Sequence, residues 1–142
     1  MNKITSIDQF IAKHFDEQSS EYIVLEAKIL NSFLKRLVDA GFQLISVNDG
    51  EDVHQIEGND RFQMLDEIFS VDDSRIKLKS NDGKEFTLVI VLGNGDATTI
   101  ADHSEISHEL EHIIFSTFGS SVKTHSEELY DLNWSGYAVT AQ

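Results

Sequence analysis

The sequence predicts a single α+β domain in which helices pack against an antiparallel sheet of about four strands. Apolar residues at helical spacing fill the N-terminal part, short runs typical of strands occupy the middle, and a helical pattern returns later. The runs in the middle are joined by connections too short for a crossover helix, which takes about a dozen residues. We therefore expect antiparallel pairing, with the N-terminal helices and the later helix packed on the sheet.

Length and composition bound the protein class. A chain of 142 residues with 40% hydrophobic residues can bury one core, so residues 1–142 should form one domain. The absence of cysteine excludes disulfide bonds, thiol nucleophiles and cysteine-ligated zinc. The N-terminus lacks a basic stretch before an apolar run, and no apolar run reaches about 18 residues. We therefore expect a cytoplasmic protein with no membrane partner.

Two helices are predicted before the first strand. Ser6 and Gln9 have the spacing of a capping box, which opens a short first helix. Ser19 or Ser20 can cap the second helix, and Gly41 fits the left-handed position after its end. The apolar stripe of the second helix consists of Ile23, Ala27, Leu30, Phe33, Leu34, Leu37 and Val38.

The first strand is predicted from Phe42 to Val47, and the turn Asn48-Asp49-Gly50 ends it. The polar and acidic segment 49–57 should lie in turns. A short helix is expected over 61–69, because its apolar residues recur on one face.

A hairpin is predicted next. Residues 75–79 alternate apolar and basic side chains, residues 86–92 form an apolar run, and the polar turn 81–83 joins them. Because the run 86–92 is apolar on both faces, we expect it to be the central, best-covered strand. Asn94-Gly95 should then turn the chain into a fourth strand at 98–100.

The later helix can be capped by Asp102 with Glu105, or by Ser104 alone, and Gly119 should end it. Its apolar stripe consists of Ile106, Leu110, Ile113 and Ile114. The segment 127–132 is predicted to form a further helical turn or two.

Negative charge is concentrated in the later part of the chain. Residues 1–48 hold six acids and five bases, whereas residues 49–142 hold nineteen acids and six bases, for a net charge of −14. Such a surplus favours attraction to basic surfaces, including the nucleic-acid-binding surfaces of other proteins. It disfavours direct binding to nucleic acid or to anionic membranes, because phosphates would repel the chain.

The acids expected to contact a partner lie in predicted turns or on the exposed face of the later helix. They are Glu51, Asp52, Asp72, Asp73, Glu109, Glu111, Glu127 and Glu128. The alternative is that the charge only keeps a small protein soluble.

One string resembles an enzyme motif. Residues 108–112, His-Glu-Leu-Glu-His, fit the pattern H-E-x-x-H, in which two histidines hold zinc and a glutamate activates water. Catalytic zinc normally has three protein ligands, and here the third would have to come from a short C-terminal tail. We therefore expect no metal and no cofactor, and keep His108 and His112 as the candidates for zinc.

Two further motifs are set aside. Gly93-Asn94-Gly95 follows an apolar strand, as in dinucleotide-binding folds, but the residues after it are predicted to be a strand where a helix is needed. The segment 48–52 gathers carboxylates around Gly50, but it lacks the ligand spacing of a calcium loop.

The central third of the chain resembles small acidic proteins encoded by tailed phages and prophages. The resemblance lies in a helix, an acidic turn, an apolar strand, a Gly-Asn turn and a short strand ending in aspartate, at 65–69, 71–73, 86–92, 93–95 and 100–102. His103 stands where those proteins have an aromatic residue. The resemblance carries no catalytic residue. It implies an accessory protein of a mobile element in a bacterial cytoplasm, and some such proteins act against host defences.

These observations predict a non-enzymatic protein that occupies a basic, nucleic-acid-binding surface of a host protein, as an anti-CRISPR or anti-restriction inhibitor would. One alternative is an immunity-type protein that neutralises a basic toxin. The other is a zinc-dependent hydrolase that uses residues 108–112.

Overall fold

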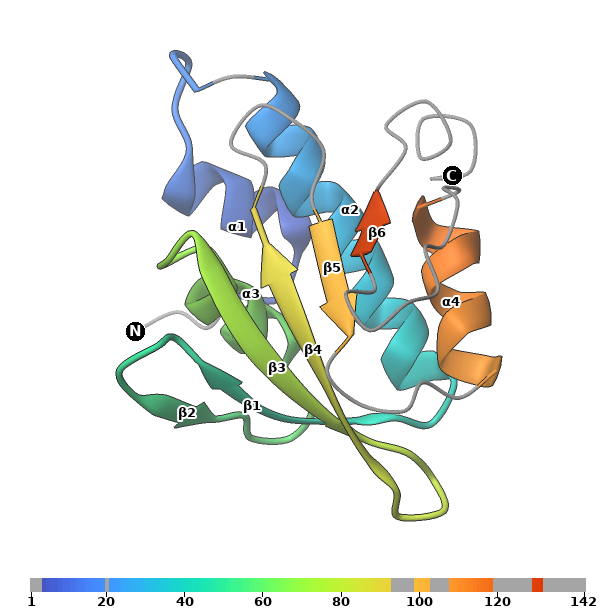
Figure 1. Ribbon diagram of the computed structural model, residues 1–142. Helices are drawn as coiled ribbons and strands as arrows, with labels where there is room; N and C mark the ends of the chain where they lie inside the picture. Colours follow the sequence, from blue (N-terminus) through green and yellow to red (C-terminus); the bar gives the residue numbers. More distant parts are fainter. Residues whose placement is uncertain (1–3, 20, 93–98, 103–107, 119–128, 132–142) are drawn as a thin grey trace.

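The computed structural model describes residues 4–19, 21–92, 99–102, 108–118 and 129–131 (Figure 1). The described helices are α1 (Ile7–His14), α2 (Glu21–Asp39), α3 (Arg61–Ile68) and α4 (His108–Phe118). The described strands are β1 (Gln43–Asn48), β2 (Val53–Gln55), β3 (Asp73–Lys79), β4 (Glu85–Val91), β5 (Thr99–Asp102) and β6 (Leu129–Asp131).

The strands form one antiparallel sheet in the order β2-β1-β3-β4-β5-β6. The α+β class is confirmed, and the four predicted strands correspond to β1, β3, β4 and β5. Two three-residue strands extend the sheet at its edges: β2 lies in the segment predicted to form turns, and β6 lies where helical turns were predicted. Both local predictions were wrong because pairing with a neighbouring strand outweighs the weak preferences of a short segment.

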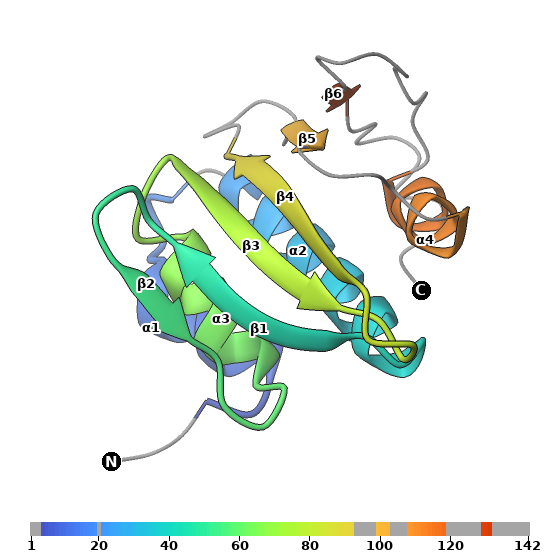
Figure 2. The same cartoon turned by 60° about the horizontal axis from the view of Figure 1, so that its bottom comes forward.

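Within the described part of the chain, the helices lie on one side of the sheet. In Figure 2, α1, α2 and α3 lie beneath β1, β3 and β4, and α4 packs beside α2. Side chains along β3 alternate accordingly: Ile76 and Leu78 are buried, whereas Arg75 and Lys77 are exposed. The prediction that β4 is central is confirmed, since it lies between β3 and β5. Phe86, Leu88 and Ile90 of β4 are buried, whereas Val91 on its other face is 37% exposed.

One hydrophobic core joins the helices to the sheet. Phe10 of α1, Phe33 of α2, Leu65 of α3, Ile76 of β3 and Leu110 of α4 are all fully buried in it. Burying each such side chain stabilises the fold by roughly 1.5–3 kcal/mol. The core therefore sets the position of α3 against the sheet.

Local signals define the helix ends. As predicted, Ser6 Oγ accepts the backbone N–H of Gln9 at 3.2 Å and opens α1. Asp60 caps α3, because its carboxylate accepts the N–H groups of the second and third helical residues. Gly41 follows α2 with φ +96°, in the predicted left-handed conformation, and lies close to the Asn81 side chain of the β3–β4 turn.

A β-bulge interrupts β1. Leu44 pairs with Leu78 and Ser46 pairs with Lys77, so Ile45 is an extra residue without its own partner on β3. The backbone N–H of Leu44 donates instead to Asn59 Oδ1 at 2.8 Å.

Candidate functional site

Four of the predicted acids gather at one end of the sheet. Asn48 of β1 pairs with Arg75 of β3 in antiparallel register, so the turn after β1 lies beside the start of β3 (Figure 2). The acids in these two segments all have exposed side chains: Glu51, Asp52, Asp72 and Asp73. We call these four residues the acidic end.

The start of β3 is fixed more firmly than the sequence suggested. Asp73 was predicted in a turn, but it is the first residue of β3 and pairs with Val91 of β4. The backbone C=O of Asp72 accepts the N–H of Leu92 at 2.9 Å. Because the neighbouring strand holds this backbone, both carboxylates extend from a fixed position.

The other predicted acids do not extend this surface within the described residues. Glu109 is exposed on α4 beside the β3–β4 turn, which lies at the opposite end of β3. The seven residues of β3 separate the two ends by about 20 Å. Glu127, Glu128 and the side chain of Glu111 lie outside what the structure describes.

The zinc candidates gain no additional ligand among the described residues. His112 is exposed on α4, whereas the side chain of His108 lies outside the described part of the chain. Among described side chains, His112 belongs to no group of three possible metal ligands.

A different group of metal-ligating side chains lies next to the acidic end. The Nε2 atom of His54 is 2.9 Å from Asp49 Oδ2 and 3.0 Å from Glu67 Oε2. We call Asp49, His54 and Glu67 the His54 cluster. Its three side chains are half-buried, with exposed fractions of 18%, 35% and 24% for Asp49, His54 and Glu67.

The turn after β1 aims Asp49 at His54. Asp49 Oδ1 accepts the backbone N–H groups of Glu51 at 2.9 Å and Asp52 at 2.7 Å. Gly50 supplies the left-handed backbone of this turn, with φ +101°. Because Oδ1 is engaged by the backbone, Oδ2 is left to face the imidazole.

Strand pairing and α3 place the other two members of the cluster. His54 pairs with Val47, whose side chain is buried on the helix-covered face, so the imidazole points toward α3. Gln63 ties α3 to β2, because its Nε2 donates to the C=O of Gln55 at 2.9 Å. Gln63 Oε1 also accepts the backbone N–H of Glu57 at 3.1 Å. Glu67 lies one helical turn beyond Gln63 and therefore faces His54.

Electrostatics follow from this geometry. The pKa of Asp49 is lowered from 3.8 to about 2, first by the backbone N–H of Asp52, then by His54 and by the N–H of Glu51. The pKa of His54 is raised above 6.5, first because Asp49 accepts its ring N–H and then by the negative charge of Glu67. The cluster therefore favours a cation between two carboxylates.

A second histidine makes a simpler pair nearby. His14 of α1 lies 2.7 Å from Asp66 Oδ1 of α3 and stacks on Phe10 at a centroid distance of 4.2 Å. Lys13 Nζ lies 4.0 Å from the same oxygen of Asp66. His14 is therefore in contact with one carboxylate, whereas His54 is in contact with two.

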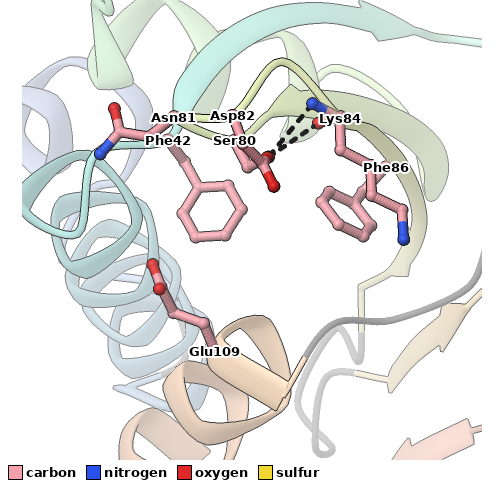
Figure 3. Close-up of a pocket in the computed structure, with 7 residues that line it drawn as sticks. All are labelled: Phe42, Ser80, Asn81, Asp82, Lys84, Phe86 and Glu109. Atoms are coloured by element: carbon pink, nitrogen blue, oxygen red, sulfur yellow. Dashed lines mark hydrogen bonds between the residues drawn. The ribbon is translucent and has the colours of Figure 1, made fainter.

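An open pocket of about 380 Å³ lies at the opposite end of β3 (Figure 3). The rings of Phe42 and Phe86 form its floor with centroids 6.2 Å apart, and Glu109 faces them from α4. On the turn above, the Ser80 hydroxyl donates to Asp82, which lowers the pKa of that carboxyl. Lys84 Nζ lies 5.6 Å from the Phe86 ring. The pocket thus combines an apolar floor with a rim of both charge signs.

Comparisons with family models, with curated proteins and with solved structures gave no match. Within the described part of the chain, no helix is long and apolar enough to cross a membrane.

Sequence reasoning missed the His54 cluster because its members are distant along the chain. Asp49 was recognised as a turn residue, but neither His54 nor Glu67 stands in a metal-binding motif. The available signal was a single histidine five residues after the Asp-Gly turn. That signal becomes informative only once β2 is known to pair with β1.

Proposed function

We propose that this protein is a non-enzymatic binding protein whose acidic end contacts a basic, nucleic-acid-binding surface on a partner protein. The convergence of Glu51, Asp52, Asp72 and Asp73, all exposed, on two adjacent segments supports this proposal. In keeping with the phage-protein resemblance, the partner is a defence protein of a bacterial host, contacted in the cytoplasm.

The fixed backbone positions of these four acids also support the proposal. The turn that holds Glu51 and Asp52 is closed by Asp49, and the start of β3 is held by β4. Carboxylates on a fixed backbone meet a basic surface with little loss of conformational freedom on binding. Complementary charge also accelerates association, and added salt weakens that effect.

Glu109 lies at the opposite end of β3, about 20 Å away. The proposed contact surface therefore excludes Glu109, which the sequence analysis had included. The proposed partner therefore meets one end of the sheet. The proposal assigns no role to His112 or to a zinc-dependent reaction.

The test compares two variants with the same net charge. The first carries Glu51→Gln, Asp52→Asn, Asp72→Asn and Asp73→Asn. The control neutralises four exposed acids elsewhere: Asp8, Glu17, Glu21 and Glu109. Each protein is immobilised and exposed to bacterial lysate, and captured proteins are then eluted with duplex DNA.

We expect the wild type and the control to capture a protein that DNA displaces. The acidic-end variant should capture less than about one tenth as much of that protein. Loss of about 1.4 kcal/mol of binding free energy is sufficient for that change. Equal capture by the two variants would show that net charge, rather than the acidic end, governs binding. Capture that DNA does not displace would argue for a different kind of partner surface.

A further inference from the structure

The His54 cluster has the composition and spacing of a metal site. We propose that Asp49, His54 and Glu67 bind one divalent transition-metal ion, with Zn²⁺ as the natural probe. The ligands would be one imidazole nitrogen and one oxygen from each carboxylate, contributed by the turn after β1, by β2 and by α3.

Distances between the ligand atoms fit one ion. In zinc sites, bonds to histidine nitrogen and carboxylate oxygen are about 2.0–2.2 Å and the geometry is tetrahedral, so two ligand atoms of one ion lie roughly 3.4 Å apart. His54 Nε2 lies 2.9 Å from Asp49 Oδ2 and 3.0 Å from Glu67 Oε2. All three ligand atoms lie within 4.8 Å of one another. An ion can therefore enter between them with small side-chain movements.

The ligand chemistry selects the class of ion. Imidazole nitrogen with carboxylate oxygens suits Zn²⁺ and its first-row neighbours. Calcium would need six to eight oxygen ligands, whereas the cluster offers two, one from each carboxylate. One nitrogen atom carries at most one proton, yet His54 Nε2 faces two carboxylate oxygens. A divalent ion would contact both carboxylates and the nitrogen at once.

Neighbouring groups orient two of the ligands in advance. Asp49 is held by the backbone N–H groups of Glu51 and Asp52, and Gln63 joins the helix that carries Glu67 to β2. Such outer contacts characterise established metal sites, where their loss weakens binding by roughly 10- to 100-fold. The pair of His14 and Asp66 lacks the third ligand within the described residues, which makes it a matched control.

The direct test is calorimetric titration of the full-length protein with ZnCl₂, against His54→Ala, Glu67→Gln and the control His14→Ala. We expect one saturable ion per chain in the wild type and in the control. Removing a ligand itself should weaken affinity at least as much as removing an outer contact, by about 100-fold for His54→Ala. Absence of saturable binding in the wild type, or unchanged binding in His54→Ala, would overturn the proposal.

A second measurement covers the case in which His54→Ala does not fold. Zn²⁺ is titrated into the wild type, and the ring signals of all histidines are followed by NMR. The proposal expects the signals of His54 to shift first, with a 1:1 endpoint. If His108 and His112 shift first, the ion binds at residues 108–112 and the proposal is wrong. Because neither experiment involves a partner protein, failure here is separable from failure of the proposed function.

Discussion

The two ends of the central strands are held by different forces. At the β3–β4 turn, Phe42 and Phe86 carry the hydrophobic core to the end of the sheet, and Gly41 packs against Asn81. At the acidic end, the structure is held mainly by hydrogen bonds and by the His54 cluster. One end therefore contributes stability, while the other presents charge on a backbone fixed by polar contacts.

The sharpest test of this difference replaces one residue at each end of β4. Phe86 is 1% exposed and Val91 is 37% exposed. We expect Phe86→Ala to destabilise the protein by about 3–5 kcal/mol, since it leaves a cavity in the core. Val91→Ala should cost less than about 1 kcal/mol, because half-exposed side chains contribute little. Urea denaturation measures both, and similar losses of stability at the two ends would show that both are held by the hydrophobic core.

The next largest effect on stability is expected at Gly41, which lies close to Asn81 of the β3–β4 turn. Gly41 has φ +96°, and a Cβ atom there would clash with the side-chain amide of Asn81. We expect Gly41→Ala to cost about 1–3 kcal/mol, because Asn81 must move in addition to the strain of a left-handed backbone. Gly50→Ala is the matched control at the acidic end, since its φ is +101° but no atom lies within 4 Å of the added Cβ. Thermal unfolding should show Gly41→Ala as the more damaging of the two.

The smallest effect is the pH dependence of stability that comes from the His54 cluster. The raised pKa of His54 means that its pairing stabilises the fold below pH 6.5, and this contribution is lost as pH rises through the folded-state value. The hydrogen bonds of the Asp49 carboxylate stabilise the fold above pH 3.8, and this stabilisation is lost as pH falls toward about 2. From these two groups, stability should be greatest between about pH 4 and 6.5.

Asp49→Asn isolates this effect. The substitution keeps an amide oxygen to accept the turn N–H groups, but it places an NH₂ group or a neutral oxygen against the imidazole. NMR titration should show the pKa of His54 falling toward 6.5, and urea denaturation should show a weaker loss of stability above that pH. Glu67→Gln should lower the pKa of His54 less, because Asp49 is the larger cause of the shift. The reverse order would show that Glu67 is the main partner.

Local sequence signals were sufficient for most of the fold. The Ser6 cap, the left-handed Gly41 and the hairpin of β3 and β4 were all predicted, because each depends on a few adjacent residues. The edge strands β2 and β6 were missed, since three residues carry almost no periodicity and form strands only by pairing with β1 and β5.

The candidate site was less predictable than the fold. Turn chemistry correctly placed Glu51 and Asp52, but only strand register shows that Asp72 and Asp73 lie beside them while Glu109 does not. The His54 cluster depends on β2 pairing and on the docking of α3, both of which are tertiary events. A contact between residues 54 and 67 has no short-range signature.

The bulge at Ile45 has a consequence for how chain length can vary in evolution. Side chains in a strand alternate with a period of two, and the extra residue allows Leu44 and Val47 to share the buried face although they are three positions apart. A homologue that lost this extra residue would still have Leu44 and Val47 on one face, then by regular alternation, and the turn that carries Asp49 would keep its orientation. We therefore expect a one-residue deletion within β1 to be tolerated best at the bulge.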